Sequence, residues 1–240
     1  MKKITASILH RYEIFDICNQ INKLNSLNEL YCSYPKYEVI KYGIPKQKIK
    51  TFIKYELLTR INDYFWKKNF YFSKYDFFLT NYFDIKISKV INQNFDIFYG
   101  SGGMCLETFK ILKPGIIKVF HSASMHIYTK KKLMINAGYN PDKIIDKEME
   151  NKYLKEIDRA DYIICTSEHS YKSYLENKIS EEKLILNPSG IDTERFYYNC
   201  IFDRDDDNFK FLFVGNLSLR KGGNKLLDAY IKIRNKNTKL

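Results

Sequence analysis

The chain has 240 residues, of which 45% are hydrophobic and 16% aromatic, so it is long and apolar enough to form a substantial core. This composition excludes a disordered or fibrous chain. The net charge of +12 favours a polyanionic neighbour, such as nucleic acid, an anionic membrane surface or a phosphorylated substrate, although a neutral compositional bias toward Lys, Asn, Ile and Tyr explains the same charge.

The cysteines argue against two classes of small stabilised domain. They are odd in number, widely spaced and contain no C-x-x-C pair, which disfavours both a disulfide framework and a zinc site. We therefore expect them to be small buried residues in a reducing compartment: Cys18, Cys32, Cys105, Cys165 and Cys200.

The amino-terminal stretch "MKKITASILHRY" imitates a signal peptide only briefly, because His10 and Arg11 end its short apolar run. No run approaches the roughly 18 to 20 apolar residues that a membrane span requires. The sequence therefore predicts a cytoplasmic protein, with peripheral contact with the inner face of an anionic membrane as a further hypothesis.

Short apolar runs alternate with helical patterns over the first two-thirds of the chain, which is typical of α/β architecture. The clearest helix is predicted over 141–159, where Ile145, Met149, Tyr153 and Ile157 recur every four residues. Strands are predicted at 4–9, 28–34, 37–43, 48–53, 95–100, 116–121, 162–167, 183–187 and 209–214.

The segment 197–208, "YYNCIFDRDDDN", is acidic and lacks apolar periodicity, so we interpret it as a linker. It separates a first domain at 1–196 from a strand and helix at 209–240. Because a domain usually needs at least about 50 residues, this second unit is predicted to be an incomplete domain.

The stretch "FVGNLSLRKGGNKLLDAY" at 213–230 reads as a strand, a turn and an amphipathic helix. Such a turn points backbone N–H groups and the positive end of the helix dipole at its ligand, and Arg220 and Lys221 add full charges. The pattern suits a diphosphate. The alternative is an ordinary turn with solvated basic residues, because the stretch fits neither standard glycine-rich phosphate motif.

Two further loops follow predicted neighbouring strands. "YGSGGM" at 99–104 contributes Gly102 and Gly103, and "HSASMH" at 121–126 contributes His121, Ser122, Ser124 and His126. In a parallel sheet these residues share the carboxyl edge, where they would hold a sugar or supply a general base. The alternatives are a flexible turn and structural histidines. No carboxylate or cysteine accompanies the histidines, which argues against a metal site.

Three stretches taken together resemble a known family. "EIDRADYIICTSEHSYKSY", "ISEEKLILNPSGIDTERF" and "FLFVGNLSLRKGGNKLLDAY" have the order and spacing of glycosyltransferase family 4, whose members are retaining enzymes of the GT-B fold. The resemblance spans about residues 150 to 230. It implies a Rossmann-like, mostly parallel sheet flanked by helices at 1–196, which is the acceptor-side domain, and the start of an incomplete second Rossmann-like domain at 209–240.

The resemblance also implies a function. A sugar would pass from a nucleotide-diphosphate-sugar, used as co-substrate without metal or cofactor, to a polysaccharide or glycolipid. Lys221 would contact the donor diphosphate and stabilise the departing phosphate, and His126 would face the reacting sugar. The remaining implied donor residues are Gly215, Asn216, Arg220 and Gly222, and those of the acceptor cleft are Gly102, Gly103, Ser122 and Ser124.

The sequence departs from the family at three points. Asn216 stands where many members carry arginine, "SILHRYEIFD" has no glycine after the first strand, and the family's paired glutamates, seven residues apart, would lie beyond Leu240. Two other hypotheses therefore stay open: a non-catalytic basic module, including one completed by a separate donor-domain chain, and a gene product shortened by a premature stop. No recognisable nucleic-acid motif is present, so nucleic acid is not expected as a partner.

Overall fold

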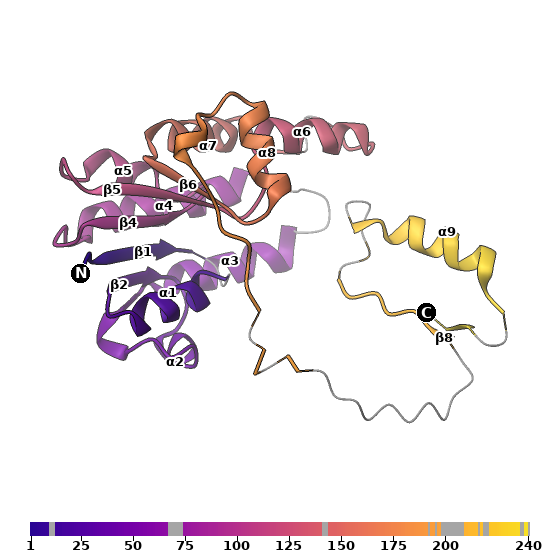
Figure 1. Ribbon diagram of the computed structural model, residues 1–240, viewed down its shortest axis with the longest axis horizontal. Helices are drawn as coiled ribbons and strands as arrows, with labels where there is room; N and C mark the ends of the chain where they lie inside the picture. Colours follow the sequence, from indigo (N-terminus) through magenta and orange to yellow (C-terminus); the bar gives the residue numbers. More distant parts are fainter. Residues whose placement is uncertain are drawn as a thin grey trace.

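The computed structural model describes residues 1–9, 13–66, 74–140, 144–191, 193–194, 196–197, 209–215, 217, 221–235 and 238–239. Within this part of the chain, a seven-stranded sheet is flanked by helices (Figure 1). Its strands are β1 (Ile4–Ile8), β2 (Leu27–Cys32), β3 (Ile49–Thr51), β4 (Ile97–Ser101), β5 (Ile117–Ser122), β6 (Tyr162–Cys165) and β7 (Leu184–Leu186).

The helices connect successive strands, so the predicted α/β alternation is confirmed. They are α1 (Ile14–Lys23), α2 (Lys36–Ile40), α3 (Ile53–Trp66), α4 (Lys74–Val90), α5 (Leu106–Ile111), α6 (Ile127–Asn136), α7 (Lys147–Arg159) and α8 (Glu168–Glu176). Two 3₁₀ turns, η1 (Lys46–Lys48) and η3 (Glu181–Lys183), precede β3 and β7.

The strand order is β3-β2-β1-β4-β5-β6-β7, and every pairing in this sheet is parallel. From β1 the chain builds the sheet outward to β3, crosses back through α3 and α4 to β4, and then builds the opposite side out to β7. The direction of building therefore reverses between β1 and β4. In open parallel sheets such a switch point leaves a crevice at the carboxyl ends of the two strands, where ligands usually bind.

The core divides between the two halves of the sheet. One cluster joins β1 and β2 to α1 and α4, and a second joins β4, β5 and β6 to α5, α7 and α8. Of the predicted stripe, Met149 and Ile157 of α7 are buried and Tyr153 is half-buried, which confirms the helix from Lys147 onward. Ile145 is buried too, but it precedes the helix, so the predicted start at 141 is wrong for residues 144–146. This helix begins after Asp146, whose side chain accepts a hydrogen bond from the backbone N–H of Glu148 and so caps the first turn.

The predicted strand at 37–43 is wrong, because these residues form helix α2 and the turn after it. Pro35, with φ of −58°, occupies the position just before the helix, and Gly43 takes a left-handed φ of +81° beyond its end. Val39 is the only buried residue of α2, so the side chains of this segment do not alternate between buried and exposed as they would in a strand.

The carboxyl-terminal unit contains β8 (Phe209–Lys210), α9 (Gly223–Ile233) and β9 (Thr238–Lys239). The predicted strand at 209–214 is confirmed only for its first two residues, which pair in parallel with β9. Most of the predicted linker, residues 198–208, lies outside the described residues, so the domain boundaries stay predictions.

The structure also bears on the predicted burial of the cysteines and on the expected lack of a membrane span. Cys18, Cys32, Cys105 and Cys165 are buried free thiols, as predicted, and Cys200 lies outside the described residues. No helix in the described part of the chain is long and apolar enough to cross a membrane.

Candidate functional site

The switch point brings together the ends of β1, β4 and β5. Met104, which follows β4, is buried, and its sulfur accepts a hydrogen bond from the backbone N–H of Leu9, just after β1, at 3.1 Å. Gly102 donates its N–H to the carbonyl of His121 at 3.1 Å and so ties the loop after β4 to the end of β5. The polar side chains of Glu13, Tyr99 and the stretch 121–126 lie at these strand ends.

Tyr99, His121 and Glu13 form a hydrogen-bonded array there. Tyr99 lies opposite Val119, two residues before His121, so the tyrosine and histidine side chains leave the same face of the sheet. The tyrosine hydroxyl is 2.7 Å from Nδ1 of His121, and Nε2 of the same ring is 2.9 Å from Oε1 of Glu13. We call this set the Tyr99–His121–Glu13 array.

The charges along the array follow from burial and hydrogen bonding. The hydrogen bond from His121 lowers the pKa of Glu13 against the opposing effect of burial, so this carboxyl is ionised at neutral pH. Burial raises the pKa of the Tyr99 phenol, which stays protonated. We therefore assign the tautomer in which Tyr99 donates to Nδ1 and Nε2–H donates to Glu13.

Glu13 is the accessible end of the array. His121 is almost fully buried, whereas about a third of the Glu13 side chain is exposed. Its second oxygen, Oε2, accepts a hydrogen bond from the Ser189 hydroxyl at 3.2 Å. The array thus presents a fixed, negatively charged carboxylate at the carboxyl edge of the sheet.

The predicted acceptor-cleft residues Gly102 and Gly103 lie in a tightly packed loop. A Cβ on Gly102 would come within 2.7 Å of the Phe120 ring, and Gly103 has a left-handed φ of +85°. The N–H of Gly103 is already occupied, since it donates to Glu156 Oε2 at 2.6 Å. The assignment of these glycines to an acceptor cleft stays a prediction.

The backbone N–H groups at the start of α5 are also occupied, because two carboxylates of the protein accept their hydrogen bonds. The backbone N–H groups of Cys105 and Leu106 donate to Glu156, and those of Glu107 and Thr108 donate to Asp84. Both carboxylates are fully buried, and Lys152 lies 3.2 Å from Asp84. Burial raises the pKa of Glu156 to about 7, while Lys152 and the backbone donors act in the opposite direction. These donors are therefore not available to a phosphate.

Ser122, Ser124 and His126 are brought together with helix α8. The Ser122 hydroxyl donates to the carbonyl of Ser124 at 2.5 Å and accepts from the Tyr174 hydroxyl at 2.8 Å. Ser170 donates to the same carbonyl at 2.8 Å. The predicted serines therefore belong to one hydroxyl network, whose role in binding a sugar stays a prediction.

His126, which the sequence suggested as the residue facing the sugar, is nearly covered. It caps α6, where its Nδ1 accepts the N–H of Tyr128 at 3.3 Å, and its ring lies 5.3 Å from the rings of Tyr128 and Tyr174. Burial lowers its pKa to about 4, so the ring is neutral at physiological pH. Its proposed contact with the reacting sugar stays a prediction.

The predicted diphosphate loop is described only in part. Gly215 has a φ of +141°, and Gly222, just before α9, has a left-handed φ of +72° with open space where a side chain would project. Lys221 is exposed beside this helix start. Asn216 and Arg220 lie outside the described residues. No group of three or more His, Cys, Asp or Glu in the described residues is arranged to hold a metal ion.

Sequence reasoning missed Glu13 and Tyr99. Glu13 follows the first predicted strand without a recognisable motif, and Tyr99 reads as one aromatic residue of an apolar strand. Glu13 and His121 are 108 residues apart, so neither composition nor spacing pairs them. The only available signal was that each follows or ends a predicted strand.

Comparisons with known proteins support the fold. No protein-family model matches the sequence, and no curated protein sequence matches it. Among solved structures, HepE of Anabaena in complex with UDP and glucose superposes with a TM-score of 0.53 at 12% identity, over 99% of this chain and 59% of that protein. The fold is of the GT-B type, which confirms the predicted Rossmann-like sheet.

UDP-GlcNAc 2-epimerases also resemble the chain. The enzyme from Methanocaldococcus jannaschii has a TM-score of 0.46 at 12% identity, and the one from Neisseria meningitidis, bound to UDP-GlcNAc, gives the same two values. Each comparison covers 77% of this chain and 45% of the epimerase. The chain therefore spans only about half the length of these solved proteins.

Proposed function

We propose that this chain is the acceptor-side domain, with the start of the donor-binding domain, of a retaining glycosyltransferase of family 4. It transfers a sugar from a nucleotide-diphosphate-sugar to a polysaccharide or glycolipid, in the cytoplasm and without metal or cofactor. The observation that carries this proposal is the fold similarity, which extends along 99% of the chain to a protein solved with UDP and glucose. The motif resemblance at 150–230 supports the same assignment.

The donor end of the proposed reaction lies at the start of α9. The first N–H groups of a helix have no partner within the helix, and they carry the positive end of its dipole. The first turn of α9 contains no acidic residue, in contrast to the occupied first turn of α5. Left-handed Gly222 leaves open space beside it, and Lys221 adds a full charge. These features suit a diphosphate and would stabilise the negative charge that develops as it departs.

The acceptor end is the Tyr99–His121–Glu13 array. An ionised carboxylate accepts about four hydrogen bonds, and the described contacts of Glu13 from His121 and Ser189 use two. The remaining capacity suits hydroxyl groups of a sugar. In the transfer, the acceptor oxygen bonds to the anomeric carbon, the bond from that carbon to the diphosphate breaks, and the hydroxyl proton passes to the departing diphosphate.

The proposal is tested by ligand binding and nucleotide release. Thermal shift and calorimetry with UDP, GDP, UDP-glucose and GDP-mannose should reveal stabilisation by at least one of them. Lys221→Ala should weaken that binding at least tenfold, whereas Lys232→Ala, which alters an exposed lysine in the last turn of α9, should change it less than twofold. Glu13→Gln should leave nucleotide binding unchanged and lower sugar transfer.

Two outcomes would contradict this function. One is the absence of stabilisation by any of the four compounds at millimolar concentration. The other is an equal effect of the two lysine substitutions, because a non-specific charge interaction would not distinguish the helix start from its last turn.

A further inference from the structure

The positive charge of the chain is concentrated in one segment. Residues 36–90 contain twelve Lys or Arg and five Asp or Glu, a net charge of +7 out of +12 for the whole chain. The described acids of this segment are largely occupied: Glu38 pairs with Lys41, Glu56 with Arg60 and buried Asp84 with Lys152. Lys50 in turn pairs with Glu29, which lies outside the segment, and Lys36, Lys46 and Lys54 are exposed to solvent.

Helix α3 in this segment has its polarity reversed. Its inward face carries the buried polar side chains of Glu56, Thr59 and Asn62 beside Tyr55. Its outward face carries apolar side chains at helical spacing, Ile53, Leu57, Ile61 and Tyr64, each of them more than 40% exposed. A helix packed only on its own domain normally shows the opposite arrangement, whereas Ile53, Leu57 and Ile61 form an apolar stripe that is exposed to solvent.

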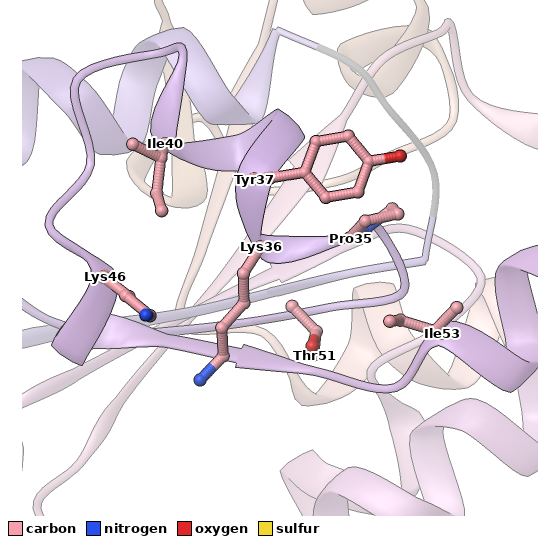
Figure 2. A pocket seen from close by; sticks show the side chains of 7 residues that line it. All are labelled: Pro35, Lys36, Tyr37, Ile40, Lys46, Thr51 and Ile53. Carbon is pink, nitrogen blue, oxygen red and sulfur yellow. The ribbon is translucent and has the colours of Figure 1, made fainter.

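The apolar face of α3 continues into an open groove of about 430 Å³. Figure 2 shows Tyr37 and Ile40 of α2 on one side of this groove and Ile53, the first residue of α3, on the other. Lys36 and Lys46 also line it, and neither forms an ion pair with any described residue. We call the groove and the outward side of α3 the α2–α3 face, with the apolar residues Tyr37, Ile40, Ile53, Leu57, Ile61 and Tyr64.

We propose that the α2–α3 face is a docking surface for an anionic phospholipid bilayer. Apolar side chains beside lysines are what binding at a lipid interface requires, because the former enter the boundary of the acyl chains while the latter meet the headgroups. The exposed lysines on or beside this face, Lys36, Lys46 and Lys54, complement an anionic leaflet. A protein partner would need a matching acidic surface, and a second copy of this basic face would repel the first.

The α2–α3 face lies at the carboxyl edge of the sheet, which also contains the candidate site. The groove is formed where the chain leaves the carboxyl ends of β2 and β3, and the Tyr99–His121–Glu13 array lies at the same edge of the same parallel sheet. Docking would thus bring the carboxyl edge toward the lipid surface. The inference does not depend on the proposed function, because vesicle binding is measured without any nucleotide or sugar.

The experiment is co-sedimentation of the chain with large unilamellar vesicles of 70% phosphatidylcholine and 30% phosphatidylglycerol, or of phosphatidylcholine alone. At low ionic strength we expect binding to the anionic vesicles, and a loss of at least tenfold on pure phosphatidylcholine or at 500 mM NaCl. Leu57→Ser with Ile61→Ser should lower the partition coefficient at least tenfold. Lys36→Gln with Lys46→Gln should lower it roughly thirtyfold.

Each double variant has a matched control. Leu133→Ser with Ile135→Ser removes an exposed Leu and Ile from α6, and Lys132→Gln with Lys155→Gln removes two exposed lysines from α6 and α7. Both controls should stay within twofold to threefold of the unaltered chain. Circular dichroism confirms that each variant folds.

The proposal is overturned if the chain ignores phosphatidylglycerol, or if test and control variants lose binding equally. It is also overturned if the unaltered chain binds no vesicles but is a dimer that Leu57→Ser with Ile61→Ser converts to a monomer. That result would assign the face to a contact between two copies.

Discussion

Replacing His126 with asparagine is expected to make the domain less sensitive to acid. The imidazole caps α6 through Nδ1 and lies between two tyrosine rings, where burial lowers its pKa to about 4. In the unfolded chain the same group has a pKa near 6.5. Between these two values the unfolded state binds a proton that the folded state does not, so stability is lost as the pH falls through this window.

The magnitude follows from the two pKa values. At pH 5 nearly all unfolded chains carry the proton and about nine in ten folded chains do not, which lowers the free energy of unfolding by about 2 kcal/mol relative to neutral pH. This is a large fraction of the 5 to 15 kcal/mol that typically stabilises a domain. The full contribution is present above pH 6.5 and is lost by about pH 4.

Urea unfolding of the unaltered chain and of His126→Asn at pH 7.5 and pH 5.0 measures the effect. Asparagine preserves an oxygen that caps the helix but does not titrate, so the variant should lose about 2 kcal/mol less between the two pH values. His169→Asn, which alters an exposed histidine of α8, should lose as much as the unaltered chain. The reasoning is refuted if all three proteins lose the same stability, or if an NMR titration places the His126 pKa at 6 or above.

Three further substitutions test the packing that supports the site, each by urea unfolding at neutral pH. Glu156→Ala removes the acceptor of three buried N–H groups and should cost about 3 to 5 kcal/mol. Gly102→Ala places a Cβ 2.7 Å from the Phe120 ring and should cost about 1 to 3 kcal/mol. Tyr99→Phe leaves Nδ1 of His121 without its donor and should cost about 1 to 3 kcal/mol.

Each of these variants has a control of the same chemistry. Asp158→Ala removes an exposed acid from the same helix as Glu156, Gly190→Ala adds a methyl group into open space, and Tyr162→Phe removes a partly exposed hydroxyl. The controls should change stability by less than about 0.5 kcal/mol. A control that costs as much as its partner would show that the local contact described for that partner is not the source of the effect.

Most strands of the sheet were predictable because their signal is local. The runs at 95–100, 116–121 and 162–167 each place several apolar residues in a row, which is how strands buried on both faces read in sequence. The same rule failed at 37–43, where Tyr37, Val39 and Ile40 imitate a strand but lie in α2. A run this short fits either element, and the neighbouring Pro35 and Gly43 decided between them.

The candidate site was predictable only in its location. Parallel strands place their carboxyl ends at one edge, so the sequence indicated where Ser122, Ser124 and His126 would gather. The sequence did not indicate which of these side chains is exposed. His126 carries the pattern expected of a sugar-facing histidine, yet the rings of Tyr128 and Tyr174 nearly cover it.

By itself, the sequence determined the α/β class, the helix stripe of α7 and the abundance of positive charge, since each depends on residues close together in the chain. The tertiary structure alone decided which distant residues meet. Because β1 lies beside β4 and β4 beside β5, Glu13 reaches His121 and Tyr99, and Glu156 reaches the turn that contains Gly103. Strand order is a property of the whole sheet, and no local pattern of residues encodes these contacts.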